Sequence, residues 1–365
     1  MTTENKVGLL PSQYIKTLIE TGIVHSDEAV TPAQVQPASL DLRLGVRAWR
    51  LRASFLPGPD IRVEERLKTV ALHEVDLTGG SVLETGCVYL AEIAETLSLS
   101  PHLSALANPK SSTGRLDVFT RLITDYGVHF DQINAGYEGN LYLEISPRTF
   151  SILVRPGSRL SQLRFRQGNT SHSDTALRLL HEHEELVSGN VDINEGVALR
   201  VNLEDQTTIA GYRAKRHAGL IDVDSHDAYD LRNFWEPLHL HGCNTLILDP
   251  DEFYILSSLE TVNIPPTHAA EMIPYNPLVG EFRVHYAGFF DPGFGHTKAG
   301  GGNSRAVLEV RSHEVPFILE HGQIIGRLVY EPLIEIPDVL YGVDIKSNYQ
   351  NQGLKLSRHF RSALS

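Results

Sequence analysis

The stretch LETGCVYLAEIAETLSLSPHLSALANP, residues 83–109, returns later in the chain in a second version, LDPDEFYILSSLETVNIPPTHAAEMIP, residues 248–274. The two stretches align without a gap at a constant offset of 165 residues. Self-similarity at a fixed register over such a span indicates two copies of one structural domain. The recurring positions are Leu83, Tyr89, Glu95, Thr96, Pro101, Ala105 and Pro109, which return as Leu248, Tyr254, Glu260, Thr261, Pro266, Ala270 and Pro274.

The repeat extends beyond these stretches. At the same offset, LEI at 143–145 matches LEV at 308–310, and RPGSRLSQLRF at 155–165 matches EHGQIIGRLVY at 320–330. Between these blocks the offset slips to 157, so that NAGYEG at 134–139 matches DPGFGH at 291–296. The second copy therefore lacks eight residues before this point and gains eight after it, around GHTKAGGGN. The copies have diverged in their loops, where function usually resides.

Each copy has the composition of a β-rich domain. Short segments rich in Val, Ile, Leu, Tyr and Phe alternate with Pro, Gly, Asn and Asp, which is typical of strands in a barrel or sandwich. Helical spacing occurs in LPSQYIKTLIETGIV from Leu10, with Pro11 in the first turn, and in a polar stretch over Thr175 to Val187. We predict a mainly β protein of two tandem domains, each a barrel or a sandwich, with few helices, divided into residues 1–170, a helical linker at 171–190, and residues 191–365.

Composition restricts the class of protein. The chain has 365 residues, 41% of them hydrophobic and 21% charged, which suits two globular domains. A net charge of −13 argues against a surface that binds a nucleic-acid backbone. The two cysteines, Cys87 and Cys243, are too few for a disulfide framework or a structural zinc site. No long apolar run or signal-peptide pattern is present, so we expect a cytoplasmic protein without a membrane association.

The densest group of anion-binding donors lies in NPKSSTGRLDVF, residues 108–119. Lysine, arginine, hydroxyl and turn N–H groups are the groups that hold phosphates. A polar turn whose serines cap the backbone would have the same composition. The second copy favours a functional interpretation, because it has Tyr275, Asn276 and Pro277 where Lys110, Ser111 and Ser112 stand in the first copy.

A glutamate interrupts an apolar strand pattern in each copy. Glu144 lies in NLYLEIS, and Glu309 occupies the equivalent place in the second copy. An acid in such a strand is costly unless it is paired or lies in a functional site. Two interpretations follow, a structural salt bridge and a catalytic carboxylate. The recurrence at Glu309 favours some structural use.

Three other motifs are candidate sites. HLHGC at 239–243 alternates histidines on a possible strand and has no evident supporting acid, so a surface pattern is favoured over a metal site. HEH at 181–183 is expected to be a solvated helix face. KAGGGN at 298–303 has no G-K-[ST] continuation and is therefore not a P-loop. We expect a flexible insertion there, with a lid as the alternative.

Four motifs, in order along nearly the whole chain, together resemble the dCTP deaminases of the trimeric dUTPase-like superfamily. They are QPASLDLRLG at 36–45, KSSTGR at 110–115, GYEGNLYLE at 136–144 and SNYQNQGLKLSRHF at 347–360. The resemblance is to the long, two-domain bacterial form. It implies tandem dUTPase-like barrels of the β-clip type, a homotrimer, and hydrolytic deamination of dCTP to dUTP and ammonia. It implies Mg²⁺ bound with the triphosphate, no catalytic zinc, and dTTP as an inhibitor.

The resemblance also implies roles for single residues. Glu144 would be the general base that activates water for attack at C4 of cytosine, with Ser111 and Arg115 beside the reacting centre. Lys110 and Ser112 would reach phosphate. The zinc-deaminase signature of H-x-E with P-C-x-x-C is absent, which agrees with a metal-free attack on the base. The complete expected substrate-binding set is Lys110, Ser112, Thr124, Tyr349 and Gln352, and no residue is expected to ligate a metal.

The chain departs from the family pattern at several positions. Relatives usually carry aspartate where this chain has Asn134, and an amide cannot serve as the base that dUTPases use. The second copy keeps Asp291 but lacks the serines and the arginine. The tail has Asn348 in place of the customary lysine, with Lys346 two residues away.

Several alternatives stay open from the sequence. The turn at 110–115 could face Glu144 of a neighbouring chain or the Glu309 segment of the second copy. We prefer Glu144, because no insertion separates it from GYEG. A dUTPase, a bifunctional deaminase and dUTPase, and a catalytically dead nucleotide-binding regulator are the alternative functions.

Overall fold

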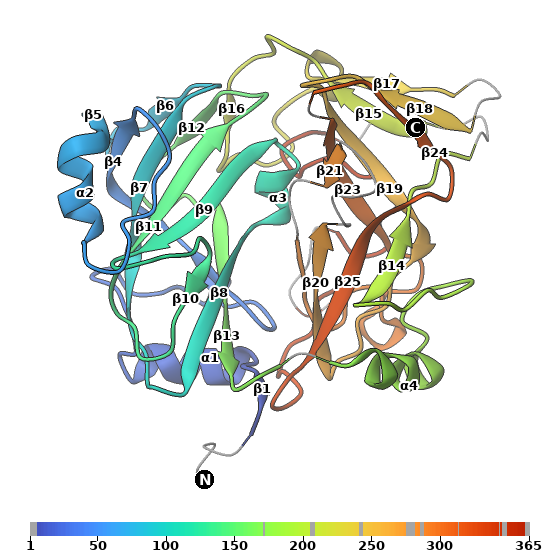
Figure 1. Ribbon diagram of the computed structural model, residues 1–365, viewed down its shortest axis with the longest axis horizontal. Helices are drawn as coiled ribbons and strands as arrows, with labels where there is room; N and C mark the ends of the chain where they lie inside the picture. Colours follow the sequence, from blue (N-terminus) through green and yellow to red (C-terminus); the bar gives the residue numbers. More distant parts are fainter. Residues whose placement is uncertain are drawn as a thin grey trace. The chain divides into compact units, whose positions relative to one another are not determined.

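The computed structural model describes residues 6–170, 172–204, 209–240, 244–274, 282–284, 288–312, 314–342, 344 and 349–361. Within these residues the fold is mainly β, as predicted, and consists of small, largely antiparallel sheets (Figure 1). None of the helices in this described part has the length and hydropathy of a membrane span.

The chain divides into two compact units. Unit 1 comprises Met1–Thr170 together with two later segments, Gly219–His226 and Leu333–Asp338. Unit 2 comprises Ser171–Ala218, Asp227–Pro332 and Val339–Ser365. The polar stretch predicted to link the domains, including its helix, therefore belongs to unit 2.

The α-helices are short and few. The helix predicted from Leu10 is confirmed as α1, which starts directly after Pro11 and buries Ile15 and Leu18. The helix predicted at 175–187 is confirmed as α4, and it ends before Glu185, whose φ is 44°. The α-helices are α1 Ser12–Glu20, α2 Val63–Val70, α3 Ser111–Gly114 and α4 Asp174–Glu184. The 3₁₀ turns within the described ranges are η1 Pro32–Gln34, η2 Leu231–Asn233 and η4 Thr297–Ala299.

Unit 1 contains two principal sheets, with strand orders β1-β13-β8-β10 and β5-β4-β7-β11-β9, and a smaller sheet ordered β16-β12-β6. Strand β16 comes from the later segment of the chain and pairs in parallel with β12. The strands are β1 Gly8–Leu9, β2 Val24–His25, β3 Leu40–Leu42, β4 Leu44–Leu51, β5 Ala71–Asp76, β6 Ser81–Leu83, β7 Val88–Ser98, β8 Leu103–Pro109, β9 Val118–Thr124, β10 Gln132–Ile133, β11 Glu138–Pro147, β12 Ile152–Val154, β13 Ser161–Gln167 and β16 Ile221–Asp222.

Unit 2 repeats this plan with sheets ordered β14-β25-β20-β22 and β17-β15-β19-β23-β21, and a pair β18-β24. An apolar core of unit 2 joins these sheets to α4 through Leu177. The strands are β14 Val197–Arg200, β15 Gly211–Ala214, β17 Trp235–Leu238, β18 Thr245–Leu248, β19 Phe253–Thr261, β20 His268–Pro274, β21 Phe282–Val284, β22 Phe289–Phe290, β23 Arg305–Ser312, β24 Phe317–Glu320 and β25 Ile324–Pro332.

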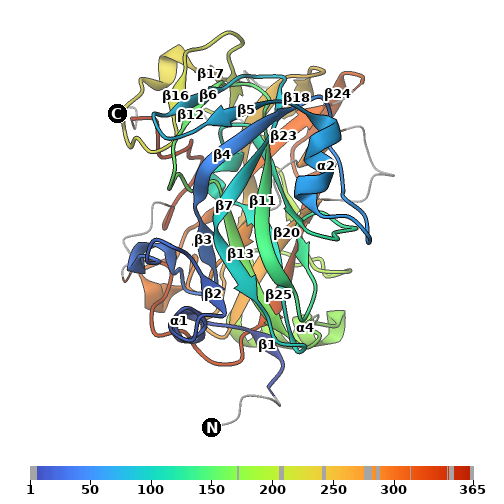
Figure 2. The same ribbon diagram turned by 90° about the vertical axis from the view of Figure 1, so that its left-hand side faces the viewer.

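The internal repeat is confirmed by strand register. Glu144 on β11 stands opposite Leu90 on β7, and Glu309 on β23 stands opposite Ile255 on β19. At the offset of 165 residues, Glu144 corresponds to Glu309 and Leu90 corresponds to Ile255. The slip to 157 is also confirmed, since β10 pairs with β8 as β22 pairs with β20 at the equivalent positions. In unit 1, Figure 2 shows β4, β7 and β11 side by side. Glu144 lies in the interior of this sheet, because β11 pairs with β7 on one side and with β9 on the other.

Candidate functional site

The serine-arginine turn forms the short helix α3. Lys110 precedes it in an extended conformation, and Arg115 ends it. Ser112, Thr113 and Arg115 are buried, whereas Ser111 keeps partial exposure. The turn leads through residues 116 and 117 into β9, so the chain that carries the donors also forms the strand next to Glu144.

Lys110 forms an ion pair with Asp41 of the QPASLDLRLG motif. The guanidinium of Arg159 lies 3.5 Å from the same carboxylate oxygen, and the Asp41 side chain is only 2% exposed. The Lys110 charge, which the sequence assigned to phosphate, is therefore balanced within unit 1. This contact joins the first two motifs of the family resemblance.

Glu144 forms a salt bridge, which was one of the two interpretations of its place in the strand, and its partner is Arg121, which the sequence did not identify. Arg121 lies opposite it in the β9–β11 register, and its Nε and one terminal nitrogen donate to Glu144 Oε1 over 3.0 and 2.6 Å. The guanidinium also packs 3.7 Å from the centre of the Phe130 ring and donates to Ser54 Oγ over 2.6 Å. These contacts fix one carboxylate oxygen and balance the buried charge.

The other carboxylate oxygen of Glu144 is available. Oε2 is buried and accepts no hydrogen bond from any residue that the structure describes. A buried carboxylate oxygen normally has a partner, and an unsatisfied one calls for an explanation such as a catalytic role or a bound ligand. The ion pair and the catalytic interpretation are therefore compatible, because they use different oxygens of one side chain.

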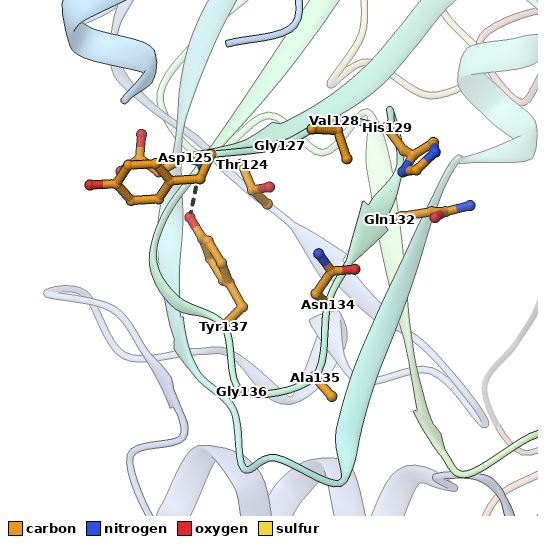
Figure 3. Close-up of a pocket in the computed structure, with 11 residues that line it drawn as sticks. Thr124, Asp125, Gly127, Val128, His129, Gln132, Asn134, Ala135, Gly136 and Tyr137 are labelled. Carbon is orange, nitrogen blue, oxygen red and sulfur yellow. Dashed lines mark hydrogen bonds between the residues drawn. The ribbon is translucent and has the colours of Figure 1, made fainter. Parts of the chain in front are cut away.

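A pocket of about 160 Å³ lies at the end of β9 and in the loops that follow (Figure 3). It is lined by residues 124–129, Gln132 and residues 134–137. Thr124 is buried at one wall, and exposed Asn134 stands opposite it. The Tyr137 hydroxyl accepts a 3.3 Å bond from Asp125 N–H, and burial raises the pKa of this phenol. The pocket thus contains one expected substrate-binding residue and the position of the expected aspartate.

The C-terminal segment packs within unit 2. Tyr349 and Gln352 are buried, and the Tyr349 hydroxyl accepts a hydrogen bond from Arg358 N–H. Residues 358 and 359 then accept backbone hydrogen bonds from 227–229, and Phe360 packs against Phe234 and Trp235. Asn348 and Lys346 lie outside the described residues.

The second copy contains only part of the site. Glu309 and Asp291 are both buried. Residues 275–281, which replace the serine-arginine turn, lie outside the described residues, as do residues 241–243 of HLHGC. HEH at 181–183 lies on α4, as expected. No group of three or more His, Cys, Asp or Glu in the described ranges could hold a metal ion.

The described structure brings the predicted residues together only in part. One continuous segment, 110–144, carries the turn, the pocket and Glu144 with its Arg121 partner. Tyr349 and Gln352 lie in unit 2. Arg121 and Asp41 are the site residues that sequence reasoning missed, and each became apparent only through strand pairing.

Two family models match the chain. Residues 6–169 match the model described as the 2'-deoxycytidine 5'-triphosphate deaminase N-terminal domain, and residues 173–360 match the model of the C-terminal domain. Among curated relatives, the protein named "dCTP deaminase, dUMP-forming" of Tropheryma whipplei strain Twist is 32% identical over 160 residues, which cover 44% of this chain and 78% of that protein. The protein with the same name from Beutenbergia cavernae is 32% identical over 158 residues, covering 43% and 78%.

A solved structure resembles the chain over both units. The 2'-deoxycytidine 5'-triphosphate deaminase from Agrobacterium tumefaciens is 58% identical, with a TM-score of 0.86. The match covers 90% of this chain and 100% of that one.

Proposed function

The chain belongs to the dCTP deaminase family, and we propose from this premise that it deaminates dCTP hydrolytically, with the chemistry carried by the 110–144 segment of unit 1. Water replaces the exocyclic amine at C4 of cytosine, and the products are dUTP and ammonia. The observation that carries the proposal is Glu144, which is buried, held by Arg121 through one oxygen and free at the other.

Glu144 Oε2 takes a proton from water while the water oxygen bonds to C4. The proton moves to N3, which gives a neutral tetrahedral centre. The hydroxyl on C4 then gives its proton to Glu144 Oε2, which passes it to the amine, and the C4–N bond breaks to release ammonia as the C4 carbonyl forms. One carboxylate that accepts and returns protons suits both halves of this reaction. Arg121 keeps the carboxylate in one orientation, and such positioning supplies much of the catalytic effect of a fixed base.

The α3 turn supplies the polar donors. Ser111, which keeps partial exposure, and Arg115 are proposed to stabilise the developing tetrahedral centre. Ser112 is proposed to contact phosphate. Lys110 adds its charge at the same place, with Asp41 fixing its position. Thr124 is proposed to contact the nucleoside, because it lines the pocket at the end of β9.

Mg²⁺ is proposed to enter as part of the substrate, on the triphosphate. This ion retains several waters and binds through phosphate oxygens, so it does not require a protein cage. Attack at C4 is proposed to proceed without zinc, since neither Cys87 nor Cys243 lies in the P-C-x-x-C half of the zinc-deaminase signature. The donor set of the described residues fits a magnesium–nucleotide complex better than a resident metal.

The proposed end product is dUTP. Asn134 stands in the pocket where the resemblance expects the aspartate of a pyrophosphate-releasing enzyme. An amide cannot accept a proton from water as a carboxylate does. The product proposed for this chain, dUTP, therefore differs from the dUMP that the names of the curated relatives give as their product.

Assembly and location follow from the family pattern. We propose a homotrimer, in which Tyr349 and Gln352 of the tail contribute to the substrate site, and a cytoplasmic location. Feedback inhibition by dTTP is proposed on the same basis.

Chromatography of the products formed from dCTP and Mg²⁺ tests the proposed function. We expect dUTP and ammonia in equal amounts, with no pyrophosphate. Release of dUMP with pyrophosphate would show the bifunctional reaction instead. Unchanged dCTP under these conditions would refute the deaminase.

A further inference from the structure

The loop 291–296 of unit 2 is the structural counterpart of the loop 134–139 that forms one side of the unit 1 pocket. In unit 1, Leu99 N–H donates to the Tyr137 carbonyl over 2.8 Å. In unit 2, Ile264 N–H donates to the Phe294 carbonyl over 2.8 Å. These are the same positions under the repeat, so the two loops are held to their sheets in the same way.

The unit 2 loop already holds a ligand, which is the side chain of Gln350 from the C-terminal segment. Its Oε1 accepts a 3.1 Å hydrogen bond from Gly295 N–H. Its Nε2 donates to the Gly293 carbonyl over 3.1 Å and to the Ala299 carbonyl over 3.2 Å. Every bond has a donor facing an acceptor, and exchanging the amide oxygen and nitrogen would break all three.

Glycines let the backbone approach this carboxamide closely. A Cβ atom at Gly301 would lie 2.7 Å from Gln350 Nε2, and one at Gly342 would lie 3.0 Å from it. Gly301 belongs to the KAGGGN insertion that is present only in the second copy. The sequence predicts a flexible insertion in this segment, with a lid as the alternative. The segment contains the 3₁₀ turn η4, and its Ala299 carbonyl accepts a hydrogen bond from Gln350 Nε2.

The residues after Gln350 hold the tail in the same place. Asn351 Nδ2 donates to the Gly300 carbonyl over 2.7 Å, and its backbone N–H donates to Ser304 Oγ over 2.9 Å. Gln352 Nε2 donates to the Arg305 carbonyl over 3.0 Å, and its own carbonyl accepts from Arg305 N–H over 2.8 Å. The inserted glycines and the tail therefore form one hydrogen-bonded substructure.

We propose that unit 2 is closed by an internal ligand, with the Gln350 carboxamide occupying a dedicated amide-binding site in residues 291–301. A primary carboxamide presents an acceptor and a donor on two atoms bonded to the same carbon, as N3 and the amine of cytosine do at C4. In unit 2 the carboxamide of Gln350, from the C-terminal segment of the same unit, makes these donor and acceptor contacts. It follows that the chain binds one pyrimidine nucleotide, in unit 1, and this second statement rests on the proposed function.

Chemical rescue tests the amide site directly. Gln350→Ala removes an acetamide-shaped fragment, so we expect the unfolding midpoint to fall by about 5 °C or more. Acetamide at millimolar to molar concentration should restore at least half of that loss with saturation, and acetate should not. Gln323→Ala is the matched control, because this glutamine of unit 2 accepts one bond from Glu320 N–H in a turn. It should respond to acetamide no more than the unaltered protein.

A second variant distinguishes the loss of the amide contacts from a general misfolding of Gln350→Ala. Gln350→Glu keeps the size of the side chain but sets an acceptor against the carbonyls of Gly293 and Ala299. It should lose at least as much stability and gain nothing from acetamide. An unchanged midpoint in Gln350→Ala, or an acetamide effect equal in all proteins, would overturn the amide site.

Calorimetric titration with magnesium dCTP tests the second statement. One equivalent bound per chain is expected, and two equivalents would overturn it. Absence of any binding would count against the proposed function, and the acetamide result alone would then decide the inference.

Discussion

A carboxylate in the interior of a sheet needs a partner that balances its charge. Glu144 has this partner in Arg121, which stands directly across the β9–β11 pair. The Glu144 side chain is 2% exposed and that of Arg121 is 25% exposed. The arginine also rests on Phe130, and a guanidinium over an aromatic face gains a further favourable interaction.

Arg121→Ala should therefore destabilise the protein by about 3 kcal/mol, the lower end for a broken buried pair, because the arginine is partly solvated. Urea denaturation monitored by circular dichroism measures the change. Arg47→Ala is the control, since its bond to Glu92 lies in a more exposed pair (47% and 22%) and should cost less than about 1 kcal/mol. Equal losses in the two variants would show that the Glu144 pair is not energetically distinct.

The sequence could identify Glu144 but not Arg121. An acidic residue within an apolar strand pattern is easily recognised in the sequence. Its ion-pair partner depends on which strand pairs with that strand and in what register, which the sequence does not show. Lys110 is a second example. Its positive charge indicated an anionic partner, and the structure shows an ion pair with the carboxylate of Asp41.

At the scale of single elements, α4 illustrates how a linker becomes part of a domain. Leu177 is 1% exposed in the core of unit 2, while Leu179, two residues later, is 54% exposed. Arg178 of the same helix donates to the Ile193 carbonyl over 2.7 Å. The helix therefore packs against the core of unit 2 along the face that carries Leu177, and its opposite face is exposed to solvent.

Leu177→Ala should lower the unfolding free energy by about 2 to 5 kcal/mol, because it leaves a cavity in a packed core. Leu179→Ala on the exposed side of the same helix should change it by less than about 0.5 kcal/mol. Thermal denaturation of both variants provides the comparison. A neutral Leu177→Ala would mean that α4 contributes nothing to unit 2.

The segment before α4 meets strand β20 through a histidine pair. His172 Nε2 and His268 Nε2 are 3.0 Å apart, and Thr267 Oγ1 bonds the other nitrogen of His268. Burial, followed by the nearby His172, lowers the pKa of His268 to about 4. Burial also lowers the pKa of His172. The charge of Glu331 acts in the opposite direction and raises this pKa, but by less.

Because the folded-state pKa of His268 lies below its unfolded value of about 6.5, protons bind preferentially to the unfolded chain between these values. Stability should be fully present above pH 6.5 and fall by about 2 to 3 kcal/mol as the pH drops to 4. Urea titrations across this range would measure it. His268→Gln should flatten the curve, whereas His25→Gln, at an exposed side chain (65%), should not.

Elements were predictable where their pattern is local. Helix α1 and strands β7 and β11 follow from periodicity, and the repeat assigned the second set of strands in the correct register. Helix α2 was not predicted, because its eight residues are too few for a clear period. The parallel pairing of β16 with β12 was equally inaccessible, since it joins segments almost 70 residues apart.

At the scale of the whole molecule, duplication separates two tasks. Both copies retain the buried glutamate and its strand register. Only the first copy retains the serines and the arginine of the α3 turn. The second copy gained glycines that enclose its own tail. We therefore propose that the first copy carries catalysis and that the second has a structural role.

The initial rate of ammonia release from magnesium dCTP, compared among the unaltered protein, Glu144→Gln and Glu309→Gln, tests this assignment most directly. Loss of the base should slow Glu144→Gln by about 10²- to 10⁴-fold, with circular dichroism confirming that it folds. Glu309→Gln should keep a rate within about threefold of the unaltered protein, because no reacting group is removed. A Glu144→Gln variant of full activity, or loss confined to Glu309→Gln, would contradict the account.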